Sequence, residues 1–136
     1  MILCDTGPLV ALIDRHDPYH YRCVTALSVL GRELLITTLP CVTEAMYLLH
    51  RAGGLGAQEQ LWQFIDDRLV IVYEHDTDEL TNMRALMRQF EDSPMDFADA
   101  SLMAAADPLK AEVIFTLDQH FFAYRTPTGR ALRVVP

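Results

Sequence analysis

Two apolar runs in this sequence end abruptly in a carboxylate. Residues 2–4 are followed by Asp5, and residues 113–117 are followed by Asp118. Each run has the composition of a buried strand, so each acid would lie at the carboxyl end of a strand. In an open parallel sheet, ligands bind outside that edge. A carboxylate held there is costly unless a cation or a proton neutralises it, so both acids are candidates for chemistry.

Three further acids fall near the starts of expected helices. Glu44 lies in the helix expected over residues 41–52, among apolar neighbours that argue against an exposed position. Asp96 and Asp99 lie in the first two turns of a helix expected to begin at Pro94. Residues 93–96 fit a capping box with a serine N-cap, which gives Asp96 a structural explanation. Asp99 lies one turn further in, where capping does not explain it, so Asp99 is preferred for the site and the role of Asp96 stays open.

The acids would repel one another strongly if the fold brings them to one edge. Two like charges about 4 Å apart repel by about 4 kcal/mol at an effective dielectric near 20. Either the pKa values of the carboxyl groups rise or a cation binds among them. Oxygen ligands suit Mg²⁺ or Mn²⁺, whereas zinc prefers histidine or cysteine. Hard divalent ions at such sites promote phosphodiester cleavage.

Two threonines flank the acids at the strand ends. Thr6 follows Asp5, and Thr116 precedes Asp118 by two positions. A hydroxyl there could hold a carboxylate or a water molecule. The alternatives are a helix cap for Thr6 and a β-branched strand residue for Thr116.

The elements that must position these side chains alternate between strand and helix. Strands are expected at residues 2–5, 34–37, 69–72, 113–116 and 134–135. Helices are expected at residues 9–13, 17–31, 41–52, 61–65, 80–90 and 94–106, with a short one near residue 121. This alternation predicts a three-layer α/β/α sandwich with a mainly parallel sheet. No repeat or linker divides residues 1–136, which we expect to form a single domain.

The composition sets limits on the class of protein. No apolar run is long enough to span a membrane, and the N-terminus lacks the basic leader of a signal peptide. The three cysteines are widely spaced and lie among apolar residues, which is typical of buried thiols in a reducing compartment. A cytoplasmic protein is therefore expected. The bulky aromatic residues, including Tyr19, Tyr21 and Trp62, are expected in the core.

The net charge of −8 is unfavourable for nucleic-acid binding in general. However, ten of the eleven basic residues are arginine, the better bidentate ligand for phosphate. The segment 119–136 carries three of these arginines and no acid. A phosphate-bearing partner is therefore not excluded.

Four motifs in this order resemble those of the PIN-domain ribonucleases. They are Asp5-Thr6 after the first strand, Glu44 within residues 38–45, Asp96 and Asp99 within residues 95–101, and Thr116 with Asp118 within residues 116–121. The resemblance extends over essentially the whole chain. The chain is also similar in size to the VapC-type toxins of bacterial toxin–antitoxin pairs.

The resemblance implies an endoribonuclease that depends on Mg²⁺ or Mn²⁺, is usually a homodimer, and is blocked by a cognate antitoxin. Carried over, the metal-binding acids would be Asp5, Glu44, Asp99 and Asp118, and Thr116 would be a supporting hydroxyl. Asp96 is additional to the commonest form of the third motif, so it is the least secure ligand. The expected function is RNA cleavage, with the acids holding the metal and activating water.

Two alternatives to a toxin stay open. A housekeeping nuclease of the same fold without an antitoxin, or a catalytically silent binding module, would share the architecture. Asp5-Thr6-Gly7 is also the tripeptide of aspartic proteases, but those are all-β proteins, and the helical spacing of residues 78–106 opposes that class.

Overall fold

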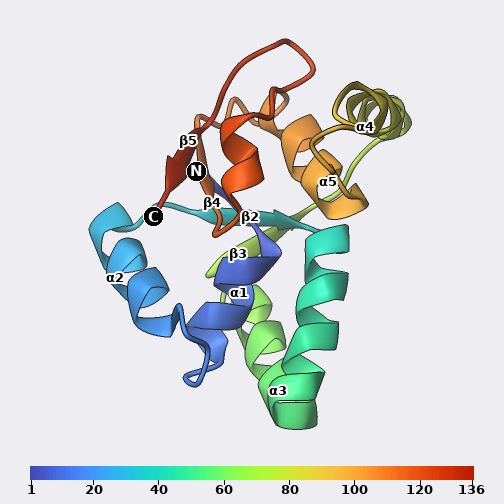
Figure 1. Cartoon of the computed structure of the whole chain (residues 1–136). Coiled ribbons are helices and arrows are strands. Elements are labelled where there is room, and N and C mark those ends of the chain that lie inside the picture. The colour runs from blue at the N-terminus through green and yellow to red at the C-terminus, as the bar shows by residue number, and fades with distance from the viewer.

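The structure is a computed structural model that describes all residues from 1 to 136. The strands are β1 (Ile2–Cys4), β2 (Leu35–Thr38), β3 (Val70–Tyr73), β4 (Val113–Phe115) and β5 (Arg133–Val135). The helices are α1 (Thr6–Ile13), α2 (His20–Leu30), α3 (Leu39–Asp66), α4 (Thr77–Gln89) and α5 (Phe97–Ala106), with a 3₁₀ turn, η1 (Gln119–Phe122). Figure 1 shows their arrangement.

The five strands form one sheet in the order β3-β2-β1-β4-β5, and every neighbouring pair is parallel. The expected α/β sandwich with a mainly parallel sheet is therefore confirmed. The central strand β1 pairs with β2 on one side and with β4 on the other.

Helices cover both faces of the sheet, as Figure 1 shows, with α1, α2 and α3 on one face and α4, α5 and η1 on the other. Side chains alternate across β1: Leu3 packs into the core under α4 and α5, whereas Ile2 and Cys4 pack into the core under the first three helices. A strand buried on both faces is continuously apolar, which explains the first apolar run.

The order in which the chain adds strands to the sheet reverses direction between β1 and β4. From β1 the chain runs outward through β2 to β3, and it then crosses to the other half of the sheet, where β4 lies beside β1. The carboxyl ends of β1 and β4 therefore flank the topological switch point, where open α/β sheets bind ligands.

The starts of α2 and α5 differ from the sequence-based expectation, whereas the break expected at residues 53 and 54 is found. The helix expected to open at residue 17 begins at His20, because the Asp17 side chain accepts a hydrogen bond from the Tyr19 backbone N–H in a preceding turn. The expected break at Gly53 and Gly54 appears inside α3, where both residues leave helical geometry and Gly54 has a φ of 65°. That positive φ favours glycine.

The core contains all three cysteines as buried free thiols, as expected. The expectation for the aromatic residues is wrong at several positions: Tyr19, Tyr21 and Trp62 are all exposed. They lie on outward faces of the loop and helices rather than between layers. No helix of this structure combines the length and the apolar character that crossing a membrane requires.

Candidate active site

Asp5 lies at the N-terminus of α1, directly after β1. Its Oδ1 accepts a hydrogen bond from the Thr6 backbone N–H at 2.7 Å, and its Oδ2 accepts one from the Thr116 hydroxyl at 2.7 Å. Burial raises the pKa of this carboxyl to about 6; the two hydrogen bonds oppose the rise, and the charges of Asp118 and Glu44 add to it. Thr116, at the end of β4, thus holds Asp5 across the switch point.

Asp96 and Asp99 form a reciprocal capping box at the start of α5. The Asp96 side chain accepts from the Asp99 backbone N–H at 2.8 Å, and Asp99 Oδ2 accepts from the Asp96 backbone N–H at 3.1 Å. The expected box with Ser93 as N-cap is therefore wrong, because α5 begins three residues after Pro94. Capping does account for one oxygen of Asp99, contrary to expectation.

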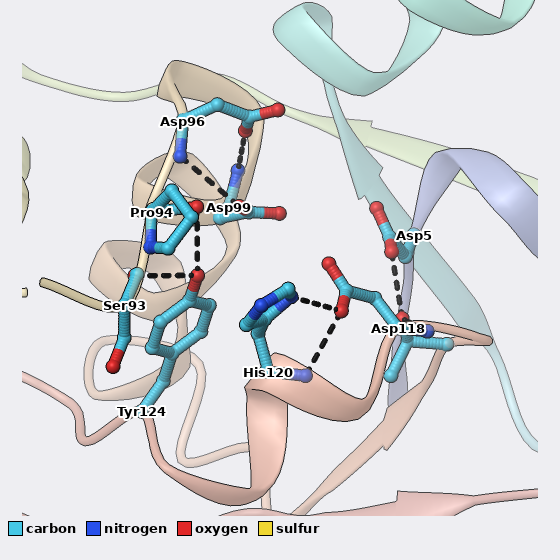
Figure 2. Close-up of polar contacts among 9 residues, drawn as sticks. Asp5, Ser93, Pro94, Asp96, Asp99, Asp118, His120 and Tyr124 are labelled. Carbon is cyan, nitrogen blue, oxygen red and sulfur yellow. Dashed lines mark hydrogen bonds and ion pairs between the residues drawn. The ribbon is translucent and has the colours of Figure 1, made fainter.

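Asp99 nevertheless differs from an ordinary cap. It is buried, with 7% of its surface exposed, whereas Asp96 is exposed. Its Oδ1 accepts no hydrogen bond and faces the space between α5 and the strand ends (Figure 2). Burial raises the pKa of the Asp99 carboxyl well above its usual range, and the charges of Asp96, Asp5 and Asp118 raise it further against the hydrogen bond from Asp96.

Asp118 is the N-cap of η1, and its Oδ1 accepts hydrogen bonds from the backbone N–H of His120 at 2.9 Å and from the His120 ring at 2.6 Å. Its own backbone N–H donates to the Thr116 hydroxyl at 3.0 Å. Thr116 therefore joins Asp118 to Asp5. Sequence reasoning missed His120, although its position two residues after a capping acid is the usual spacing for such a contact.

Glu44 comes from the second turn of α3. Its Oε2 accepts a hydrogen bond from the Thr6 hydroxyl at 3.0 Å, so Thr6 positions Glu44 rather than capping a helix. The expectation that apolar neighbours would bury Glu44 is wrong, because the residue is exposed. The nearby apolar side chains do not form one inward stripe: Leu39 and Leu48 are themselves exposed, at 57% and 41%.

The structure brings Asp5, Asp99 and Asp118 to one edge of the sheet. Figure 2 shows their carboxylates facing a common space. The charges of Asp5 and Asp118 both contribute to the raised pKa of Asp99, so the three groups interact electrostatically. The one basic group in contact with these acids is the imidazole of His120.

The acids suit a hard divalent cation by chemistry, because they offer only oxygen ligands and two of them are buried with raised pKa values. The acids lie further apart than in the five-acid metal site that the sequence predicts. No three histidine, cysteine, aspartate or glutamate side chains lie close enough together to hold a metal ion as they stand. The donor set fits, but the carboxylates would have to draw together around the ion.

Tyr124 ties the loop after η1 to the loop before α5. Its hydroxyl donates to the Ser93 and Pro94 carbonyls, each at 3.1 Å, and its ring lies parallel to that of His120 with centroids 6.4 Å apart (Figure 2). Sequence reasoning did not find this link, because nothing local to residue 124 indicates it.

The basic tail has mainly structural contacts. Arg130 donates to Asp107 and to the carbonyls of Ala106 and Ala111, and Arg125 donates to carbonyls of its own loop. Arg130 is therefore not free to hold a ligand, whereas Arg125 uses only its Nη1 in these bonds. The largest apolar cavity near the acids, of about 530 Å³, borders Glu44 but none of the three clustered aspartates.

Comparisons with known proteins agree with this fold. The family model of the PIN domain matches residues 2–126. Among solved structures, the chain is similar to the Mycobacterium tuberculosis protein VapC20, described as a sarcin-ricin loop cleaving toxin. The TM-score is 0.78 at 19% identity, over 87% of this chain and 90% of that one.

It is also similar to FitAcB from Neisseria gonorrhoeae, with a TM-score of 0.62 at 17% identity over 100% of this chain and 97% of that one. At these identities the two structures support the fold alone. No curated protein sequence matches the chain.

Proposed function

The chain belongs to the PIN domain family, and from that premise we propose that it is a metal-dependent endoribonuclease and the toxin of a toxin–antitoxin pair. The observation that carries the proposal is the meeting of Asp5, Asp99 and Asp118 at the switch point of the sheet (Figure 2). Three carboxylates from different elements, two of them buried, have no structural need to face one another.

Asp5, Asp99 and Asp118 would hold Mg²⁺ or Mn²⁺, with Glu44 at the rim. When bound, such a cation stabilises the negative charge that develops on a phosphate under attack. Thr116 keeps Asp5 oriented by its hydrogen bond to Oδ2, and His120 keeps Asp118 oriented by its bond to Oδ1. Glu44 Oε1 has no hydrogen-bond partner and is free to accept a proton from the attacking water.

The toxin assignment goes beyond the nuclease assignment. It is supported by the similarity to VapC20, which is described as a toxin, and by the matching size of the two chains. We further propose a cognate antitoxin that covers the acidic edge, a homodimeric assembly and a cytoplasmic location. A housekeeping nuclease of the same fold would share the acids but would not arrest growth when produced alone.

The proposal is tested by incubating the purified protein with unstructured RNA in EDTA and then with Mg²⁺ or Mn²⁺. Internal cleavage should appear only with metal and should be lost in Asp5→Asn. That variant keeps the shape of the side chain and can accept from the Thr6 backbone N–H, while its amide would donate to the Thr116 hydroxyl. Metal-independent cleavage, or equal cleavage by the variant, would overturn the assignment. Induced expression in a bacterial host should arrest growth for the wild type and not for the variant if the nuclease is a toxin.

A further inference from the structure

A small polar cavity borders Asp118 but neither Asp5 nor Asp99. Its volume is about 220 Å³. Its lining residues come from α2, the end of β4, η1 and the end of β5, and they are Arg22, Thr116, Leu117, Asp118, Gln119, Phe122, Val134 and Pro136. Asp118 therefore borders both this cavity and the acidic edge. Pockets for drug-sized ligands run from roughly 300 to 1,000 Å³, so this one suits part of a single nucleotide.

Arg22 gives the cavity a positive charge. The residue is exposed on α2 and forms no ion pair. Its one hydrogen bond is a long one, 3.3 Å from its Nη2 to the Pro136 carbonyl oxygen. Most of the guanidinium donors therefore remain free, in contrast to those of Arg130, which are engaged by Asp107 and two carbonyls. A free guanidinium beside an acidic edge is suited to a phosphate.

Phe122 gives the same cavity an aromatic wall. Its side chain is 65% exposed at the end of η1, although the neighbouring Phe121 is buried in the core. Most of this residue is open to solvent, and exposed aromatic rings can stack on unpaired bases of single-stranded RNA. Gln119, also exposed, adds an amide that can donate to or accept from a base edge.

We propose that this cavity is a nucleotide subsite for single-stranded RNA, in which Arg22 binds a backbone phosphate and Phe122 stacks on a base. The inference rests on the proposed function, because it places the nucleotide next to the bond that the acids would cleave. It also explains how an acidic protein holds a polyanion: a single free arginine and a stacking ring act at one point, without a broad basic face.

The test measures binding separately from cleavage. Asp99→Asn serves as the background, so that RNA stays intact, and the probe is a short fluorescein-labelled oligouridine followed by anisotropy. Arg22→Ala and Phe122→Ala are compared with Arg133→Ala. Arg133 is an exposed arginine that lines a cavity at the amino ends of the strands, so it controls for net charge.

Arg22→Ala should weaken RNA binding about fivefold or more. It should also make the slope of the log binding constant against log salt concentration less negative by about 0.7, the contribution of one phosphate contact on a single strand. Phe122→Ala should weaken binding about fivefold or more, the loss of one stacked base, with the slope unchanged. Arg133→Ala should match the background protein. Thermal melts of each variant check that the fold is intact.

Equal effects of Arg22→Ala and Arg133→Ala would overturn the subsite in favour of general electrostatic attraction. Unchanged binding in either cavity variant, or no binding by the background protein at low salt, would also overturn it. Cleavage of RNA by the wild-type protein, measured in parallel, tests the proposed function independently. If the wild-type protein cleaves RNA but Arg22→Ala leaves RNA binding unchanged, only the subsite is rejected. If Arg22→Ala weakens RNA binding but the wild-type protein does not cleave RNA, only the nuclease function is rejected.

Discussion

Helices α4 and α5 begin with the same capping box but use it differently. In α4, Asp76 caps the helix and Glu79 returns a hydrogen bond to the Asp76 backbone N–H at 2.8 Å. In α5, Asp96 and Asp99 make the same reciprocal pair. Local backbone chemistry is therefore identical at the two helix starts.

The difference lies in the second oxygen of the returning acid. Glu79 Oε1 accepts a hydrogen bond from the Tyr73 hydroxyl, so both oxygens of Glu79 are satisfied. Asp99 Oδ1 accepts none and faces Asp5 and Asp118 (Figure 2). Glu79 thus uses its remaining oxygen within the fold, whereas Asp99 leaves one oxygen free in a buried acidic edge.

The acids at the two ends of α5, Asp99 and Asp107, also differ in whether they have a partner. Asp107, at the C-terminal end, accepts hydrogen bonds from Arg130 Nε at 3.0 Å and Nη2 at 2.8 Å, and from the Thr128 backbone N–H at 2.8 Å. Burial opposes ionisation of this carboxyl, but the hydrogen bonds from Thr128 and Arg130 outweigh it and lower its pKa. The fold neutralises the acid that it uses for structure and leaves Asp99 without a cation.

Matched amide substitutions test whether the carboxylate of Asp99, unlike that of Glu79, is needed for RNA cleavage. Asp99→Asn should lower RNA cleavage by roughly a hundredfold or more, the usual scale for removing one charge-stabilising group from an active site. Glu79→Gln, at the equivalent position of α4, should leave cleavage within about twofold, because both oxygens of that carboxylate are used within the fold, by the cap and by Tyr73. Single-turnover cleavage in Mg²⁺ measures both.

Equal loss of activity in the two variants would show that Asp99 acts through the stability of its helix. A thermal melt of each variant in EDTA serves as the control. Asn can still accept the hydrogen bond from the Asp96 backbone N–H, so α5 should keep its start.

The stability of the metal-free protein should fall as the pH rises through about 6. The pKa of Asp5 is raised to about 6 in the folded protein from 3.8. The folded state therefore binds more protons between these values, and the associated stability is complete below pH 3.8 and lost above pH 6. Asp5→Asn should remove the part of this dependence that comes from Asp5, leaving the part from Asp99, whose pKa is also raised, and should stabilise the protein by up to about 3 kcal/mol at pH 8 in EDTA.

Urea denaturation at pH 5 and pH 8, with and without millimolar Mg²⁺, measures this effect. Metal should recover stability at pH 8 in the wild type and not in Asp5→Asn, since a ligand that binds only the folded state stabilises it once its concentration exceeds the dissociation constant. A wild-type protein that is more stable at pH 8 than at pH 5 in EDTA would contradict the raised pKa.

The sequence predicted the acids that follow strands better than those that begin helices. Asp5 and Asp118 follow apolar runs whose ends are marked by the acids themselves, so the parallel sheet brings them to adjacent strand ends. At α5, both Ser93 and Asp96 are acceptable N-caps with an acid three residues later. The long-range bonds of the Tyr124 hydroxyl to the Ser93 and Pro94 carbonyls accompany a turn there, and those contacts are invisible to local pattern.

The sequence also did not predict which side chains are exposed or unpaired. The apolar run around Glu44 suggested burial, but the residues are spread around the helix, and the outward ones are exposed. Likewise, charge counting pointed to the arginines of the tail, whereas the fold engages Arg130 with Asp107 and two carbonyls and leaves most donors of Arg22 in α2 free beside Asp118. Only the packed structure decides which charges have partners.

Loss of the charge at the C-terminal end of α5 should destabilise the protein, whereas Asp5→Asn should stabilise it. Asp107→Asn should destabilise the protein by about 1–2 kcal/mol at pH 7, because it weakens charge-assisted hydrogen bonds from Arg130. The lowered pKa means that the contribution of Asp107 is present above pH 3.8 and is lost as the pH falls below it. Urea denaturation should therefore show the largest loss at neutral pH, with RNA cleavage unchanged. Stabilisation by this variant at pH 7 would contradict the assigned role.

The smallest expected effect decides whether Asp96 is a cap or a ligand. Asp96→Ser retains an oxygen that can accept from the Asp99 backbone N–H and removes the charge, as Asp76→Ser does in α4. Each change should alter stability by at most about 0.5 kcal/mol, because serine and aspartate cap equally well. Asp96→Ala removes the cap as well and should cost about 1 kcal/mol. If Asp96 only caps, Mn²⁺ affinity measured by calorimetry stays within about threefold in Asp96→Ser; a loss as large as that of Asp99→Asn would instead make Asp96 a ligand, because its exposed carboxylate would then have turned toward the ion.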